Sequence, residues 1–367
     1  MAEYVASKEN KKLDILDLSR LEPLAEAVLE KGAWGYIHSG AESEWTMRQN
    51  TAAFDGLQIV PRVLSGVEKP DTRTQILGVD LSMPIILTPA AAHGLAHEDA
   101  EVASVKGVAE AGTLMGISTY ANRTLADIAK AAGGAPLWFQ LYFNKDEGFN
   151  RFLLEQAVAC GMKAIVLTAD TTVAGHREID DINHFVYPVK MANVEQFNTG
   201  KGQGIGELIG GTQQKLTPDI VGWIAERTKL PVLVKGIQSP EDAMLAIGAG
   251  ASGVWVSNHG GRQLDGAPAS IDSLIRVARA VEKRVPIVFD SGIRRGQHVF
   301  KAIASGADVV AIGRPVFYGL ILGGAQGVAS VFRHLQKELV TVMQLAGTQN
   351  VERIKHTHLI EKNYAAV

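Results

Sequence analysis

From residue 83 onward, the 367-residue chain alternates short, nearly continuous apolar runs with longer amphipathic segments. Runs of this kind are typical of strands in a parallel sheet that is covered on both faces. The predicted strands are 84–88, 113–118, 137–143, 164–169, 231–235, 253–257, 286–290 and 309–313. Helical patterns occupy 101–111, 125–132, 150–160, 219–228, 241–247, 271–282 and 297–304.

Strand–helix units repeated eight times predict an α/β fold, a closed (β/α)8 TIM barrel. An open, doubly wound sheet is the alternative, but no Gly-x-Gly-x-x-Gly follows the first strand, which weakens a dinucleotide-binding fold. We expect one domain over 1–367, with 1–65 as an N-terminal helical cover, 83–346 as the barrel and 347–367 as a C-terminal tail.

Two long segments depart from this repeat. Residues 171–218, after the fourth strand, contain the polar, glycine-rich run 198–206, and a loop of this length in a barrel predicts a lid or an insert. The uncharged stretch 315–332 approaches the length of a membrane span. Four glycines and Gln326 interrupt it, so we expect a buried helix and a turn.

Composition and charge narrow the function classes. The net charge is −3 and basic residues form no dense run, which argues against nucleic-acid binding through a basic face. The single cysteine, Cys160, lies at a predicted helix end and is expected to be a structural thiol. Residues 1–14 are polar and lack the apolar core of a signal peptide. We therefore expect a soluble, cytoplasmic protein without a membrane partner.

Polar residues follow the predicted strands where a TIM barrel carries its active site. His259 and Arg262 lie on a glycine-rich turn after the sixth strand, and Asp170 follows the fourth. A histidine takes up a proton near neutral pH, and a carboxylate fixes its tautomer. An arginine grips a carboxylate with two parallel N–H groups. The pattern predicts proton removal from a small carboxylic acid; a structural turn with a capped histidine is the alternative.

Other polar positions leave more than one interpretation open. Arg177 is either a second substrate arginine or a surface arginine paired with Glu178 or Asp180. Lys235, at the end of the fifth strand, either faces a flavin or forms a Schiff base with a sugar phosphate. Gln140 and Thr168 favour the flavin.

The loops after the last two strands predict a phosphate site, since barrels often bind phosphate there. Its expected contacts are Gly292, Arg294, Gly313 and Arg314, although Arg314 could instead cap a strand. No spacing of His, Cys, Asp and Glu predicts a metal site. The remaining histidines with no comparable setting, expected to be structural or solvent-facing, are His93, His97, His176 and His298.

Three motifs give the chain a resemblance to a known family. Residues 257–265 (SNHGGRQLD), 289–296 (FDSGIRRG) and 311–315 (AIGRP) resemble the FMN-dependent 2-hydroxy-acid oxidases and dehydrogenases, and the likeness runs from about residue 13 to the C-terminus. Within that family, residues 89–97 and Tyr120 are most similar to the bacterial L-lactate oxidases.

The resemblance implies roles for individual residues. His259 is the implied base, paired with Asp170, and Lys235 lies beside the N1–C2 edge of the flavin. The implied substrate contacts are Tyr36, Tyr120, Tyr142, Arg177, Tyr187, His259 and Arg262. The implied FMN contacts are Pro89, Ala90, Ala91, Ser118, Gln140, Thr168, Lys235, Ser257, Asp290, Gly292, Arg294, Gly313 and Arg314.

The implied reaction is L-lactate plus O2 giving pyruvate plus H2O2, in a homotetramer or an octamer. Four alternatives stay open: a dehydrogenase that reduces quinone or cytochrome, a lactate monooxygenase, a Schiff-base lyase that uses Lys235, and a phosphate-binding module without activity. The region 320–345 is either a subunit contact or packs within the chain.

Overall fold

The computed structural model describes residues 4–198, 210–357 and 359–361. Eight parallel strands form a closed barrel in the order β10-β11-β4-β5-β6-β7-β8-β9, which confirms the predicted fold class. Each strand overlaps one of the predicted apolar runs. The strands are β4 (Ile85–Ala90), β5 (Met115–Ile117), β6 (Leu137–Leu141), β7 (Ala164–Thr168), β8 (Val232–Ile237), β9 (Gly253–Val256), β10 (Ile287–Phe289) and β11 (Val309–Ile312).

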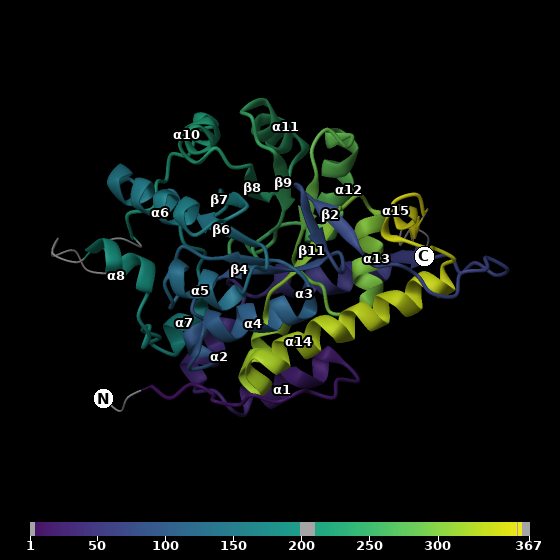
Figure 1. Cartoon of the computed structure of the whole chain (residues 1–367), viewed down its shortest axis with the longest axis horizontal. Coiled ribbons are helices and arrows are strands. Elements are labelled where there is room, and N and C mark those ends of the chain that lie inside the picture. Colours follow the sequence, from purple (N-terminus) through teal and green to yellow (C-terminus); the bar gives the residue numbers. More distant parts are fainter. Residues whose placement is uncertain (1–3, 199–209, 358, 362–367) are drawn as a thin grey trace.

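Helices follow the strands and surround the barrel (Figure 1). Those after the strands are α4 (Glu101–Ala111), α5 (Leu125–Ala132), α6 (Glu147–Ala159), α10 (Asp219–Thr228), α11 (Pro240–Gly248), α12 (Ser270–Val281), α13 (Gly296–Ala304) and α14 (Arg314–Leu345). The predicted bounds of α4, α5 and α10 are correct at both ends. Gly112 ends α4 in the left-handed region, with φ of 70°, where a glycine has no steric cost.

Alternating side chains of the strands enter two apolar layers. Along β6, Trp138 points into the barrel, where it packs edge-on against Trp255 with ring centroids 6.3 Å apart. Its neighbours Leu137 and Phe139 belong to the larger layer between the strands and the helices. Burial on both faces explains why each strand reads as a continuous apolar run.

Residues 4–17 of the N-terminal segment are not helical, and the helical elements that follow are η1 (Leu18–Arg20), α1 (Leu21–Glu26), α2 (Lys31–His38), α3 (Trp45–Ala52) and η2 (Ala53–Gly56). Two short sheets were not predicted. Strand β1 (Leu57–Ile59) pairs with β12 (Leu359–Glu361), which ties residues of the expected tail to the N-terminal segment. Strands β2 (Thr74–Ile76) and β3 (Val79–Leu81) form a hairpin. The tail also contains α15 (Val351–Ile354).

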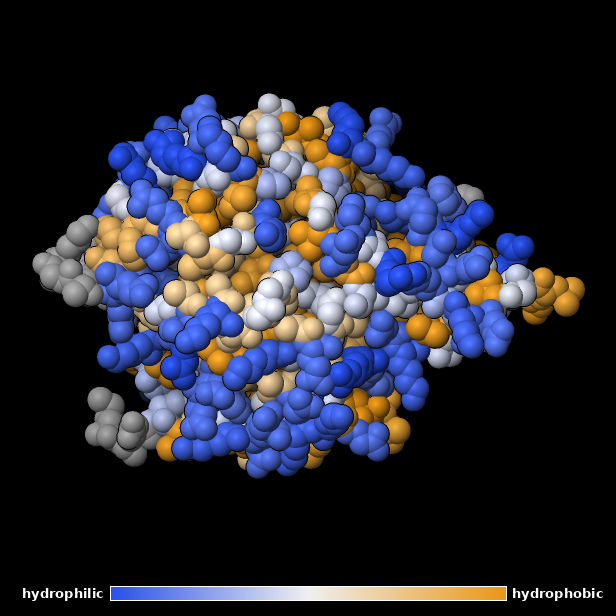
Figure 2. Space-filling view, in the orientation of Figure 1, coloured by the Kyte–Doolittle hydropathy of each residue, from blue (hydrophilic) through white to orange (hydrophobic). Residues whose placement is uncertain are grey.

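Helix α14 contains the apolar stretch 315–332. By length and composition it is the one helix among the described residues that could cross a membrane, but 78% of its most apolar window is buried inside the protein. Gly323 and Gly324 are non-helical, so the expected turn is a kink after which the helix continues to Leu345. The face in Figure 2 is hydrophilic around most of its rim, and apolar groups are more frequent toward its centre.

The long segment after β7 contains the short helices α7 (Glu178–Ile182) and α8 (Ala192–Asn198). It packs on the loop after β5, where the amide of Ala192 donates to the carbonyl oxygen of Ala121 at 2.9 Å. Most of the predicted glycine-rich run lies outside the described residues. A short turn, η3 (His93–Leu95), follows β4.

Candidate active site

A cavity of about 880 Å³ opens at the C-terminal ends of the barrel strands. Its walls include α2, the segment after β7 and the turns after β9, β10 and β11. The sequence-predicted residues that line it are Tyr36, Pro89, Ala90, Ala91, Tyr120, Tyr142, Arg177, Tyr187, Lys235, His259, Arg262, Asp290, Gly292, Arg294, Gly313 and Arg314. The barrel topology therefore brings together positions that are up to 278 residues apart, the separation of Tyr36 and Arg314.

His259 and Asp170 form the pair expected from the sequence. Nδ1 of His259 lies 3.0 Å from Oδ1 and 3.2 Å from Oδ2 of Asp170. The turn that presents His259 holds it at φ of 57°, a left-handed conformation, while its backbone amide donates to Oγ of Ser257 at 3.0 Å. Gly236 lies in a bulge of β8 between the two strands, and a Cβ at this position would be 2.6 Å from Cβ of Asp170.

Burial and charge set the ionisation of this pair. Burial lowers the pKa of His259, and the positive charge of Lys235 acts in the same direction, whereas Asp170 opposes both. Burial alone would raise the pKa of Asp170, but His259 and Lys235 hold it below its ordinary value. Near neutral pH the pair is therefore an imidazole beside a carboxylate, with Nδ1–H donating to Asp170 and Nε2 left to accept a proton.

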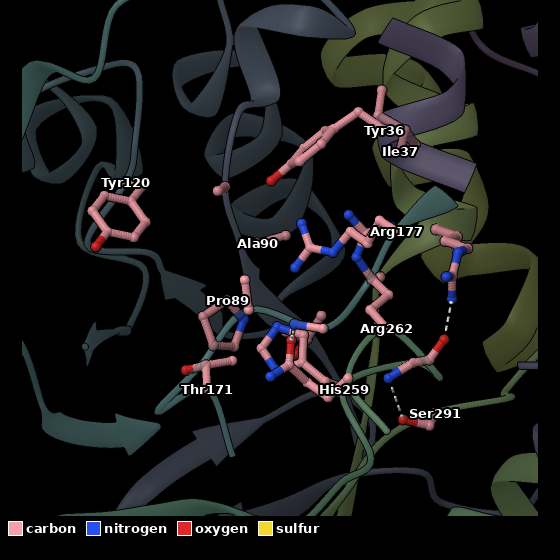
Figure 3. A pocket seen from close by; sticks show the side chains of 18 of the residues that line it. Tyr36, Ile37, Pro89, Ala90, Tyr120, Thr171, Arg177, His259, Arg262 and Ser291 are labelled. Carbon is pink, nitrogen blue, oxygen red and sulfur yellow. Dashed lines mark hydrogen bonds between the residues drawn. The ribbon is translucent and has the colours of Figure 1, made fainter. Parts of the chain in front are cut away.

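Two guanidinium groups lie next to each other above His259 (Figure 3). Arg262 and Arg177 both approach the ring of Tyr36, with Cζ 5.1 Å and 5.9 Å from its centroid. Nη1 of Arg262 donates to the carbonyl oxygen of Ser39 at 2.6 Å, which fixes the direction of its remaining N–H groups. Nε of Arg177 is buried and has no hydrogen-bond partner among the described residues, so it is available to an anion.

This geometry favours the substrate-site interpretation of Arg177 over the surface ion pair. No ion pair joins it to Glu178 or Asp180 among the described residues, and it lines the cavity rather than the surface. Arg177 therefore faces the same space as Arg262, as the substrate-site interpretation requires.

Three further tyrosines surround the cavity. Tyr120 stacks on Tyr142 with ring centroids 5.2 Å apart, and Tyr187 meets Tyr36 edge-on at 5.0 Å. Burial raises the pKa of Tyr120 to about 12 and also raises that of Tyr142. Both hydroxyl groups stay protonated at neutral pH and can donate hydrogen bonds.

Lys235 is almost fully buried, with an exposed fraction of 4%. Its Nζ donates to Oγ of Ser257 at 3.0 Å and lies 3.4 Å from Oδ2 of Asp290. Oδ2 of Asp290 also accepts from Nε1 of Trp255 at 3.0 Å. The lysine is therefore paired with a hydroxyl group and a carboxylate at the cavity wall, an arrangement that fits the polar edge of a flavin.

Four predicted cofactor contacts are buried residues that do not line the cavity: Ser118, Gln140, Thr168 and Ser257. Among them, Gln140 places Oε1 3.2 Å from the amide nitrogen of Thr119. Its Nε2 is buried without a hydrogen-bond partner in the described part of the chain. A buried amide nitrogen is costly to leave unpaired, so it fits a bound group with acceptor atoms.

The predicted phosphate contacts also line the cavity. Gly292 has φ of 90°, and Gly313 directly precedes the first residue of α14. Arg314 lines the cavity, and its Nε, Nη1 and Nη2 also donate to the carbonyl oxygens of His38, Gly260 and Ser39, at 2.9, 3.0 and 2.8 Å. These three bonds of the Arg314 guanidinium group join the end of α2 to the turn that carries His259, so Arg314 does not cap a strand.

Some cavity residues were not predicted. Ser291, with φ of 83°, accepts from the amide of Gly260 at 3.0 Å and donates to Oδ1 of Asp290 at 2.8 Å. Asp180 and Gln263 also line the cavity, and Asp180 was considered only as a partner of Arg177. His176, expected to be structural or solvent-facing, lies at the cavity wall with Nε2 3.3 Å from Oδ2 of Asp181.

Comparison with known proteins assigns this site to a family. Residues 25–361 match the family model of FMN-dependent dehydrogenases. The chain belongs to this family. A protein of Lentilactobacillus hilgardii named L-lactate oxidase is 53% identical to it over 98% of both chains. Another L-lactate oxidase, from Streptococcus iniae, is 49% identical over 99% of this chain and 90% of its own length.

A solved structure agrees with the sequence comparison. The crystal structure of a Pediococcus acidilactici lactate oxidase is 52% identical and superposes with a TM-score of 0.95, covering 98% of this chain and 99% of that chain. As in its family, the cofactor of this chain is FMN. The unpaired Nε2 of Gln140 and the buried amino group of Lys235 fit the polar edges of the FMN ring. Arg294 and the turn at Gly292 fit the phosphate group of FMN.

Proposed function

We propose that this chain oxidises L-lactate to pyruvate, with FMN taking up the electrons and O2 reoxidising the flavin to give H2O2. The observation that carries this proposal is the convergence of the His259–Asp170 pair with Arg177 and Arg262 on one cavity. Relatives named L-lactate oxidases, 47–53% identical over nearly the whole chain, support the choice of lactate and O2.

The side chains divide the work according to their chemistry. The fork of Arg262 and the unpaired Nε of Arg177 bind the substrate carboxylate. Nε2 of His259 takes the hydroxyl proton, and Asp170 stabilises the imidazolium that forms. The Tyr142 hydroxyl donates to the substrate oxygen. FMN, when bound, would take up the two electrons together with the hydrogen lost from C2 of lactate.

The Schiff-base lyase has less support than the oxidase. A Schiff base requires a neutral amine, whereas Nζ of Lys235 lies 3.4 Å from the Asp290 carboxylate. A phosphate-binding module without activity would have no use for a histidine–aspartate pair at the cavity wall. A dehydrogenase and a monooxygenase would use the same residues, so their products must distinguish them.

One experiment tests the proposal and these alternatives. Purified, yellow protein is titrated with L-lactate without oxygen, and the flavin absorbance is followed before and after air is admitted. We expect bleaching, recovery in air, and one pyruvate and one H2O2 for each lactate. Acetate and CO2 would identify a monooxygenase, and slow recovery in air with rapid reduction of a quinone would identify a dehydrogenase. A colourless protein that takes up no flavin would contradict the proposal.

We further propose a cytoplasmic homotetramer or octamer, on the basis of the family resemblance. Within the suggested contact surface 320–345, Leu320, Val331 and Leu339 are buried in the chain, whereas Arg333, Lys337 and Leu345 are exposed, so the exposed side is the part that could contact a neighbouring subunit. Light scattering on the purified holoenzyme tests the assembly, and a monomer at micromolar concentration would contradict it.

A further inference from the structure

The side chain of Gln263 joins the turn after β9, which carries His259 and Arg262, to the loop after β7, which carries Asp170 and Arg177. Its Nε2 donates to the carbonyl oxygens of Asp170 and Val173, at 2.8 and 2.9 Å. Its Oε1 accepts from the amide of Gly175 at 3.2 Å. All three partners belong to the loop after β7, whereas Gln263 itself directly follows Arg262 on the turn after β9.

We infer that Gln263 is a positioning residue, which sets how His259 meets Asp170 and how Arg262 meets Arg177. The inference rests on the proposed function of this site. Gln263 acts through the backbone of residues 170–175, because its amide group is occupied by the three bonds to that loop.

The chemistry of the bonds explains why an amide is needed here. The loop presents two acceptors and one donor to a single side-chain end, and a primary amide carries the matching two donors and one acceptor. A glutamate of the same length would place a carboxylate against the carbonyl oxygens of Asp170 and Val173. A methionine of similar length would form none of these bonds.

The two loops are also in close contact at Gly175. A Cβ on Gly175 would collide with the carbonyl oxygen of Arg262 and lie 2.7 Å from Cα of Gln263. Among the described residues, the other side-chain bond between these two loops is the His259–Asp170 bond itself. Without Gln263, the loop would keep its backbone bond from the Glu42 amide to the carbonyl oxygen of His176, but near Asp170 the His259–Asp170 bond would have to carry more of the restraint.

Loss of this restraint has a specific expected effect on catalysis. A misplacement of about 1 Å between reacting groups costs roughly 10²-fold in rate. The Asp170 carboxylate raises the pKa of His259, so a displaced carboxylate would let that pKa fall further. The acid limb of the kcat/KM profile, which reports the free base, would then move to lower pH.

The test compares Gln263→Met with Gln336→Met in the holoenzyme. Gln336 is a matched control, because its Nε2 joins α14 to Thr72 and Ser82, at 2.9 and 3.3 Å, outside the residues that line the cavity. For Gln263→Met we expect kcat/KM for L-lactate to fall roughly 10- to 100-fold. We also expect pyruvate to perturb the flavin spectrum only at higher concentration, and the acid limb of the kcat/KM profile to move to lower pH. Gln336→Met should lower only the melting temperature.

Each outcome decides the inference. An unchanged pH profile and unchanged pyruvate binding in Gln263→Met would overturn it, whatever the change in melting temperature. Gln263→Glu provides a second variant of the same size, with the same expected loss of kcat/KM and of pyruvate binding. If neither variant folds with FMN while Gln336→Met does, the bonds serve the fold and the inference is wrong. A wild-type enzyme inactive on L-lactate would instead contradict the proposed function.

Discussion

Nδ1 of His259 lies 3.0 Å from Oδ1 of Asp170, although 89 positions separate the two residues in the chain. Asp170 follows β7 and His259 follows β9, so β8 lies between them in the barrel. The contact is possible because β8 bulges at Gly236, where no side chain occupies the space beside Asp170. The base and its carboxylate are thus brought together by the barrel and by one glycine.

The Asp170→Asn variant tests this pair. An amide cannot stabilise the imidazolium, so we expect kcat/KM for L-lactate to fall by roughly 10²–10⁴. Because Asp170 raises the pKa of His259, its loss should also move the acid limb of the profile to lower pH. The measurement is kcat/KM against pH, with FMN content checked by absorbance.

Asp308→Asn is the control for this prediction. Asp308 also forms an ion pair, with Nζ of Lys355 at 2.7 Å, but it is not among the residues that line the cavity. It should lower stability and leave the pH profile unchanged. Equal kinetic losses in both variants would show that Asp170 acts through the fold rather than through the base.

The Arg262→Lys variant tests the carboxylate clamp, by which we mean the guanidinium groups of Arg262 and Arg177. Arg262 bonds to the carbonyl oxygen of Ser39 and still presents N–H groups to the cavity, whereas an ammonium group has no planar fork with which to do both. We expect KM for L-lactate to rise about 10- to 100-fold, the value of one charged hydrogen bond, with FMN still bound. Arg227→Lys, which removes a guanidinium stacked 3.8 Å from the Trp223 ring, is the control. Wild-type KM in Arg262→Lys would contradict the clamp.

The sequence predicted the barrel because its strands are buried on both faces. Each strand therefore gave a continuous apolar run, and the position of His259, Asp170 and Lys235 at strand ends followed from the topology. The short strands β1 and β12 could not be predicted, since three residues are too few for a periodic pattern. Tyr36 was placed by family resemblance alone, because its helix carries no local signal of a site.

Other features depend on contacts that no local pattern reveals. The Arg314 bonds to the carbonyl oxygens of His38 and Ser39 span more than 270 positions, at separations of 276 and 275 residues. The cavity position of Asp180 depends on how the segment after β7 folds back over the barrel. The assignment of each residue to a role in catalysis stays a prediction.

Ala91→Gly tests which side chain limits the size of the substrate. Ala91 lines the cavity at the end of β4, and removing its methyl group enlarges the space beside the proposed lactate site. One such group in an apolar pocket changes the ratio of kcat/KM values for two substrates that differ by it roughly 10- to 200-fold. We therefore expect kcat/KM for 2-hydroxy acids with larger side chains to rise at least about 10-fold relative to L-lactate. An unchanged ratio across a series of increasing side-chain length would count against this role.

Asp180→Asn tests a negative charge beside the clamp. Asp180 lines the cavity, and its Oδ1 is buried without a hydrogen-bond partner among the described residues. Burial raises its pKa, although Arg262 and Arg177 oppose that shift. As pH rises through this pKa, the carboxylate becomes charged and competes with lactate for the two arginines, so KM should rise with pH in the wild type.

The variant should remove that rise, because an amide carries no charge at any pH. At neutral pH we expect KM for L-lactate to be roughly 3- to 10-fold lower than in the wild type, about 1 kcal/mol of charge interaction. Asp181→Asn is the matched control, since the adjacent carboxylate is exposed and pairs with His176. If Asp180→Asn and the wild type show the same KM at every pH, Asp180 is already neutral or lies too far from the arginines to influence substrate binding.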